Sequence, residues 1–120
     1  MLKQVIHGNI PSKSNSYRIV TLCGHGSLAK TPSLKVYEES FYAQCSIRGK
    51  NIQGFFKLDV DIYYKNMRPD LDNAFKVLLD CLQTCKVIKN DRQCMEIHAR
   101  KIVDKKDPRV EFEIEEIDFK

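Results

Sequence analysis

Residues 55–85 read FFKLDVDIYYKNMRPDLDNAFKVLLDCLQTC, a strand pattern followed directly by a helix pattern. Hydrophobic and polar residues alternate through 55–64, which predicts a strand with one buried face. Hydrophobic residues then recur every three or four positions through 71–85, which predicts an amphipathic helix. A strand that leads straight into a helix indicates a fold that mixes both kinds of element.

Further elements are expected on both sides of this stretch. A helix should begin near Thr31-Pro32-Ser33 and run over 33–49, where Gly49 ends it. Strands are expected over 2–7, 17–23, 94–103 and 109–117, with a turn at 24–26 and a closing hairpin formed by the last two strands. We therefore expect one domain over 1–120 of the α/β (α+β) class, in which two main helices cover a mixed sheet.

Composition places the chain among globular proteins. The 120 residues are 42% hydrophobic and 30% charged, which excludes a disordered chain. No apolar run approaches the ~20 residues that span a bilayer, and the first residues lack the apolar stretch of a signal peptide. We expect a cytosolic protein.

Charge is distributed unevenly along the chain. Residues 1–69 carry ten Lys and Arg against four Asp and Glu, whereas 70–120 carry ten against twelve. This asymmetry favours a polyanion-binding surface near a site that bears carboxylates. Candidate phosphate contacts in the basic half are Lys13, Arg18, Lys30, Lys35, Arg48 and Lys50, and Tyr17 is a candidate for stacking on a base.

The five cysteines allow one alternative site. Cys81, Cys85, Cys94 and His98 have a spacing from which a zinc site can be drawn, although no C-x2-C pair is present. Small buried thiols are the favoured interpretation.

Two aspartates stand where the strand hands over to the helix. Pro69 ends the extended segment, which puts Asp70 at the helix N-cap and Asp72 in the first turn. Capping and the helix dipole explain one carboxylate well and two less well. Both can also converge on one cation, with Lys76 on the same helix face.

A third carboxylate would come from Asp91. A helix of about 14 residues carries the chain ~20 Å away from Asp70, and the residues up to Asp91 reach back about as far if they are extended. Asp91 therefore approaches the pair either by a direct return or from a partner subunit.

Two segments resemble a known family. RPDLDNAFKVLLDCL at 68–82 and NDRQCMEIHARK at 90–101 are similar to the D-x-D-N-x-x-K and D-D-x-Q motifs of the RusA-type Holliday junction resolvases, and GNIPSKSNSYR at 8–18 resembles the loop after that family's first strand. The likeness covers nearly the whole chain. Asn90 stands where the family often has a second aspartate, and the basic run before the motif holds only Lys65 and Arg68.

The resemblance implies a function. The members of the RusA-type family are homodimeric, Mg²⁺-dependent endonucleases, for which Mn²⁺ is the expected substitute metal. They cut four-way DNA junctions by paired symmetric nicks in recombination and repair. By resemblance, Asp70, Asp72 and Asp91 would hold the metal and Lys76 would be the catalytic lysine. Branched DNA and a second copy are then the expected partners, with no membrane, no small-molecule cofactor, and a bacterial or prophage source. We expect Lys13, Arg18, Lys65 and Arg68 to contact DNA, and Asn73, Asn90 and Glu96 to surround the ligands.

Three other interpretations stay open at this point. They are a metal-dependent nuclease for other branched structures, a catalytically weak or silent nucleic-acid-binding module, and an α/β protein whose aspartates only stabilise a helix start. A panel of DNA substrates tests the first of these, and Mn²⁺ soaked into crystals tests the last, since a helix cap would bind no metal between Asp70 and Asp72. The most informative single experiment is incubation with a synthetic four-way junction, with and without Mg²⁺, read by symmetric nicking.

Overall fold

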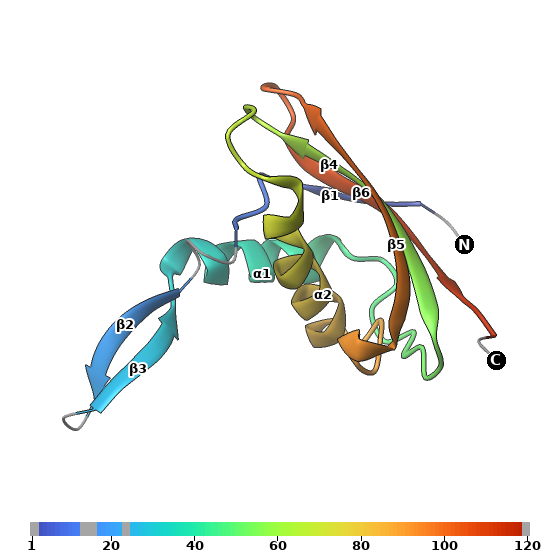
Figure 1. Cartoon of the computed structure of the whole chain (residues 1–120), viewed down its shortest axis with the longest axis horizontal. Helices are drawn as coiled ribbons and strands as arrows, with labels where there is room; N and C mark the ends of the chain where they lie inside the picture. Colours follow the sequence, from blue (N-terminus) through green and yellow to red (C-terminus); the bar gives the residue numbers. More distant parts are fainter. Residues whose placement is uncertain (1–2, 13–16, 23–24, 119–120) are drawn as a thin grey trace.

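The computed structural model describes residues 3–12, 17–22 and 25–118 (Figure 1). For residues 17–22, 25, 27 and 28 it describes the backbone alone. No helix in this part of the chain is long and apolar enough to cross a membrane.

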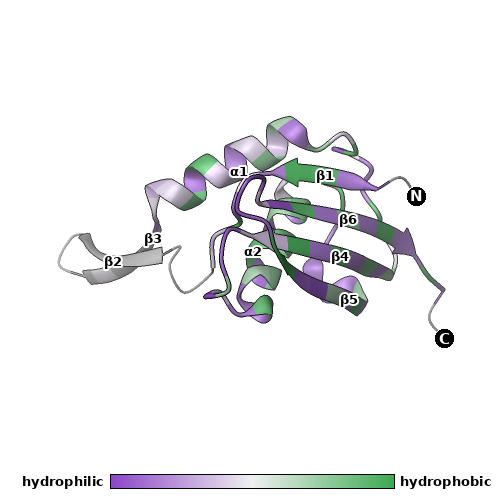
Figure 2. Cartoon of the chain, turned by 90° about the horizontal axis from the view of Figure 1, so that it is seen from above, coloured by the Kyte–Doolittle hydropathy of each residue, from purple (hydrophilic) through white to green (hydrophobic). Residues whose placement is uncertain are grey.

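A four-stranded mixed sheet forms the body of the molecule. Its strands are β1 (Gln4–His7), β4 (Phe56–Tyr64), β5 (Cys94–Val103) and β6 (Arg109–Glu116), in the order β1-β6-β4-β5. β4 alternates as its sequence predicts: Phe56, Leu58 and Val60 are buried, whereas Lys57 and Asp59 point to the other face. Figure 2 shows this alternation of hydrophobic and hydrophilic residues along the strands.

The predicted closing hairpin is wrong. β4 lies between β5 and β6 and pairs with both, parallel to β5 and antiparallel to β6. Parallel neighbours need a crossover connection, and the helical segment between β4 and β5 supplies it. Alternation identifies β5 and β6 as strands but carries no information about their partners.

Two helices cover one face of the sheet. They are α1 (Pro32–Gln44) and α2 (Phe75–Thr84), and α2 is preceded by a 3-10 turn, η2 (Leu71–Ala74). α1 buries Leu34, Tyr37 and Phe41, and the Phe41 ring stacks on Phe112 of β6 with 6.2 Å between centroids. The other face of the sheet is open and carries mostly charged side chains. The hydrophobic core therefore lies between the sheet and the two helices.

α1 is shorter than the predicted 33–49. It begins as expected, with Pro32 in its first turn after the N-cap residue Thr31, but it ends at Gln44. The Arg48 guanidinium folds back and donates to the carbonyl oxygens of Tyr42 and Cys45, at 2.5 and 2.9 Å. These bonds satisfy the last helical carbonyls, so the chain turns before Gly49, which adopts φ +80°.

A separate two-stranded hairpin projects from the body (Figure 1). It consists of β2 (Tyr17–Leu22) and β3 (His25–Lys30). β2 was expected, whereas β3 begins inside the segment predicted as a turn at 24–26. The Gly-rich composition of that segment hid the strand, because glycine is depleted in strands.

Candidate active site

Asp70 and Asp72 lie where β4 hands over to α2. Asp70 has an extended backbone and occupies the N-cap position of η2, and Asp72 lies in the first turn, as the sequence predicts. The Asp70 side chain makes no capping hydrogen bond. Helix capping therefore does not account for Asp70.

Both carboxylates lie near the hydroxyl group of Tyr64. This tyrosine is buried at the end of β4, and its hydroxyl donates to the Asp70 carbonyl oxygen at 3.5 Å. Burial, followed by the negative charges of Asp72 and Asp70, raises the pKa of Tyr64 to about 12. Neither carboxylate makes a hydrogen bond or ion pair with the residues that the structure describes, so the pair remains without a positive partner.

Asp91 returns to α2 within its own chain. It opens a second 3-10 turn, η3 (Asp91–Gln93), and its backbone N–H donates to Gln83 Oε1 on α2 at 3.2 Å. Lys76 Nζ lies 2.5 Å from Asp91 Oδ2 and 3.1 Å from Asp80 Oδ1. Hydrogen bonds to Asp91 and then to Asp80 raise the pKa of Lys76, which keeps the lysine charged at neutral pH.

The acidic trio is thus divided into an unpaired pair and an ion pair. Asp70 and Asp72 lie near enough to the Tyr64 hydroxyl for their charges to raise its pKa. Asp91 forms an ion pair with Lys76, which lies one helical turn after Asp72. Across residues 3–12, 17–22 and 25–118, no three His, Cys, Asp or Glu side chains are arranged to hold a metal ion. The zinc alternative finds no support, because Cys81 and Cys85 lie in the core and His98 lies on the open face.

The three surrounding residues have different positions. Asn90 caps η3, because its side-chain oxygen accepts from the Arg92 backbone N–H at 3.0 Å. Asn73 lines a hollow of about 330 Å³ beside Arg68, and residues 9–12 form the wall of that hollow, which brings the N-terminal loop next to the motif. Glu96 points to the open face of the sheet, where its carboxylate bonds His98 at 2.6 Å, so it lies away from the aspartates.

The expected DNA contacts are described only in part. Lys13 and the side chains of Tyr17 and Arg18 lie outside the described residues. Lys30 forms an ion pair with Glu38 at 2.9 Å, and Arg48 is used at the end of α1.

Lys65 and Arg68 are exposed in the loop that leads to Asp70. Three further lysines lie at this end of the sheet and were absent from the sequence candidates: Lys101, Lys105 and Lys106. They belong to the half of the chain that has more acidic than basic residues. Comparing the net charge of the two halves therefore does not point to these lysines.

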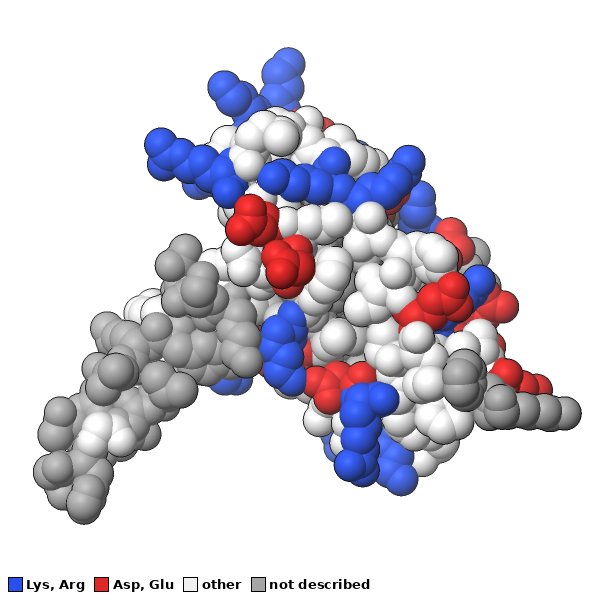
Figure 3. All heavy atoms as spheres, in the orientation of Figure 1, with Lys and Arg blue, Asp and Glu red and all other residues white. Residues whose placement is uncertain are grey.

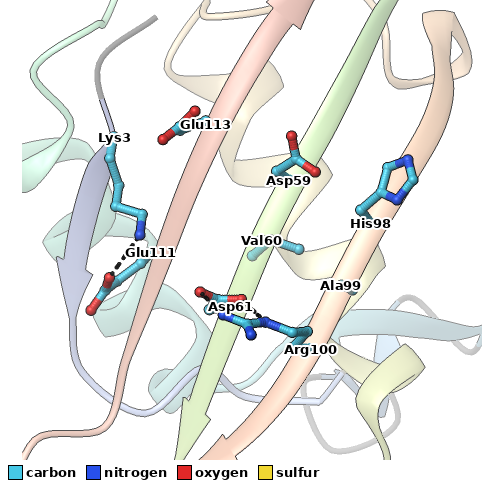
Figure 4. Close-up of a pocket in the computed structure, with 9 residues that line it drawn as sticks. All are labelled: Lys3, Asp59, Val60, Asp61, His98, Ala99, Arg100, Glu111 and Glu113. Carbon is cyan, nitrogen blue, oxygen red and sulfur yellow. Dashed lines mark hydrogen bonds and ion pairs between the residues drawn. The ribbon is translucent and has the colours of Figure 1, made fainter.

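A larger hollow lies elsewhere, on the open face of the sheet (Figure 4). It measures about 530 Å³, and much of its charge is already paired. Arg100 binds Asp61 through two nitrogens at 2.9 and 3.0 Å, and Lys3 pairs with Glu111 at 3.4 Å. This hollow is separated from the Asp70 and Asp72 pair by the sheet itself.

A comparison with known protein families matches residues 11–115 to the family described as Endodeoxyribonuclease RusA. The match covers most of the chain and includes Asp70, Asp72, Lys76 and Asp91. The chain belongs to the RusA family. A search of the curated proteins found no match.

Membership of the RusA family confirms the resemblance found in the sequence. It makes this protein a member of a family of DNA-cutting hydrolases, and RusA membership implies an endonuclease that resolves Holliday junctions in recombination. The motif that carried the resemblance is the one that the fold places at the junction of β4 and α2.

Proposed function

We propose that this RusA family protein is a Mg²⁺-dependent endonuclease that resolves four-way DNA junctions, as a homodimer, by paired symmetric nicks. One observation carries the assignment to a site: Asp70 and Asp72 lie near one hydroxyl group, and neither carboxylate has a hydrogen bond or ion pair with the described residues. Asp72 lies four residues before Lys76 in the chain. Exposed carboxylates held together without compensation attract a cation.

The donor chemistry of this pair fits Mg²⁺. Mg²⁺ prefers oxygen ligands and keeps several waters, and proteins commonly hold it through one or two carboxylates together with a substrate phosphate. Asp70 and Asp72 meet that requirement without a third protein ligand. When bound, the ion lowers the pKa of a coordinated water and offsets the charge that develops on the phosphate.

Lys76 and Asp91 act as a second unit of the proposed site. Lys76 is charged, so it donates hydrogen bonds and does not serve as a base. A DNA phosphate near Asp70 competes with Asp91 for the Lys76 ammonium group. Once Lys76 turns to the phosphate, the Asp91 carboxylate becomes available as the third acidic group of the site.

Two-fold symmetry supports the homodimer. A four-way junction and a dimer of identical chains both have two-fold symmetry, so two sites would face opposed strands. The projecting hairpin of β2 and β3 adds to this, because a two-stranded ribbon alone is only marginally stable in water. A second copy of the chain would cover this hairpin.

Incubation of the protein with a labelled synthetic four-way junction tests the proposal. We expect symmetric nicks in two opposed strands with Mg²⁺ or Mn²⁺ and none with EDTA. Asp70→Asn should reduce cleavage by at least about 100-fold, since it removes half of the negative charge that holds the cation. Mn²⁺ binding, followed by electron paramagnetic resonance, should weaken in parallel.

Asp59→Asn is the matched control. It makes the same chemical change on the open face of the sheet, and we expect wild-type cleavage and Mn²⁺ binding. Metal-dependent cleavage that survives in Asp70→Asn would exclude the assignment of the metal to this pair. Cleavage of linear duplex at the same rate as the junction would exclude the proposed substrate.

A further inference from the structure

Met67 is the most exposed large hydrophobic residue of the described chain, with 69% of its surface accessible. A single exposed methionine is ordinary on a protein surface. Its position is informative, because it lies three residues before Asp70 at the loop between β4 and η2. The loop therefore presents an apolar side chain next to the proposed cleavage site.

The backbone around Met67 is held in place. Lys101 Nζ donates to the Met67 carbonyl oxygen at 2.9 Å, and the Arg68 N–H donates to the Asn66 side chain at 3.0 Å. At the start of the loop, the Lys65 N–H donates to Asn9 at 3.4 Å. Fixing the backbone lowers the entropy that binding through this side chain would cost.

Basic residues gather at the end of the sheet where Met67 lies, and together they are called the cationic ring. The turn between β5 and β6 joins this end of the sheet, since the Asp104 N–H donates to the Tyr64 carbonyl oxygen at 2.8 Å. Figure 3 shows basic side chains gathered around this turn and the loop, beside acidic side chains over the start of α2. The cationic ring consists of Lys65, Arg68, Lys101, Lys105 and Lys106.

The fold separates charges that are mixed in the sequence DKKDPR at 104–109. Arg109 binds Asp104 at 3.0 Å and lies 3.7 Å from Asp107, which also bonds His7 at 2.9 Å. The acidic groups of the turn are thereby neutralised internally. Lys105 and Lys106 stay exposed, and within the described residues no member of the cationic ring has an acidic partner.

We propose that Met67 inserts next to an unstacked base at the branch point of the DNA, while the cationic ring binds phosphates on the arms around it. Apolar side chains, including methionine, serve as wedges that separate base steps, and flanking Lys and Arg hold the backbone. Bases next to a branch lack a complete stack, so separating them costs less than in a duplex. This inference rests on the proposed function and adds how the junction is distinguished from linear DNA.

Binding without divalent cations tests the wedge separately from cleavage. The probes are a four-way junction and a duplex with the same arm sequence, each carrying 2-aminopurine at the position of the branch. For the wild type we expect 2-aminopurine fluorescence to rise on binding to the junction alone. Met67→Ser should lower the ratio of junction to duplex affinity by about tenfold and abolish the fluorescence rise.

The matched control is Val36→Ser, which changes an equally exposed hydrophobic residue (66%) on α1. It should keep the wild-type ratio and fluorescence. Met67→Ser with a wild-type ratio overturns the proposal, and so does an equal loss for junction and duplex, which would indicate a role in loop structure only. If Asp70-dependent junction cleavage persists in either case, the proposed function stands and the wedge alone fails.

The ring is tested by salt dependence. Lys105→Glu combined with Lys106→Glu should weaken binding to both probes by roughly 10- to 100-fold and lower the slope of log K against log salt by about 2. The control is Lys86→Glu, which changes an exposed lysine just after the C-terminal end of α2. It is compared with the single variants Lys105→Glu and Lys106→Glu, and it should leave the slope of log K against log salt unchanged. Equal effects of Lys86→Glu and Lys106→Glu would show that only the net charge of the protein matters, and would overturn the proposed role of the cationic ring.

Discussion

At the scale of single residues, Tyr64 reports on the proposed metal site. Its hydroxyl sits at the end of β4, close to Asp70 and Asp72, whose charges add to burial in raising its pKa. The sign follows from the chemistry: a tyrosine loses a proton to become negative, so neighbouring carboxylates and a dry environment both favour its neutral form.

Titration of tyrosine absorbance therefore measures the charge at this site. We expect Tyr64 to ionise near pH 12 in the wild type and at lower pH in the Asp70→Asn and Asp72→Asn double variant. Mg²⁺ bound between the two carboxylates should lower the Tyr64 pKa of the wild type in the same direction. The chain has five tyrosines, so the Tyr64→Phe difference spectrum assigns the transition.

The same raised pKa makes the free energy of unfolding depend on pH at the alkaline end. Above the ordinary tyrosine pKa of 10.0 the unfolded chain ionises Tyr64 while the folded chain does not. The contribution of Tyr64 is therefore complete below pH 10 and is lost as the pH rises toward 12. If the Tyr64 pKa changes neither in the double variant nor on addition of Mg²⁺, the two carboxylates do not lie close enough to this hydroxyl to affect it.

At the scale of elements, the end of α1 depends on one cation. Arg48 donates to the carbonyls of Tyr42, Ala43 and Cys45, and its guanidinium lies 5.0 Å from the Tyr42 ring centroid. A cation at a helix C-terminus also interacts favourably with the helix dipole. Arg48, an expected phosphate contact, is thus explained by local structure.

Arg48→Ala should lower the free energy of unfolding by about 1–2 kcal/mol, since it removes hydrogen bonds from helical carbonyls. Chemical denaturation measures this change. Lys50→Ala, an exposed cation two residues away, should lower it by less than about 0.5 kcal/mol. Equal losses in the two variants would contradict a specific role for the guanidinium.

How much of each element could be predicted depends on where its contacts lie. The start of α1 and the strand 56–64 follow from local patterns, because Pro32 and the alternation act within a few residues. The end of α1 does not follow from such patterns, because Arg48 acts from outside the helix. The pairing of β5 does not follow from them either, because hydrogen bonds between strands join distant parts of the chain.

At the scale of the whole molecule, the β2–β3 hairpin extends beyond the body that the sheet and helices form (Figure 1). Hairpins of this kind gain stability when another surface covers them. We expect the protein to have the mass of two chains in light scattering, with the hairpin at the interface.

Replacement of residues 18–29 by two glycines should shift that mass to one chain, and circular dichroism should show that the remaining helices stay folded. Junction cleavage by this variant should lose the coordination of the two nicks, because coordinated cuts need two sites in one complex. A wild-type monomer would contradict the dimer, and a shortened chain that still dimerises would place the interface elsewhere.

Local patterns in the chain are enough to define the elements around the motif and the residue types of the proposed site. Local periodicity and the RPDLDN segment act over a few residues, so they identify a strand, a helix and two carboxylates between them without reference to the rest of the chain.

How these parts meet follows only from the folded arrangement of the strands. The crossover from β4 to β5 returns Asp91 to Lys76. The turn at 104–108 brings Lys105 and Lys106 to the end of the sheet where the Met67 loop begins, while Arg109 forms ion pairs with the acidic groups of that turn. Such encounters depend on the arrangement of the strands, because they join side chains that only the folded sheet brings within hydrogen-bonding distance.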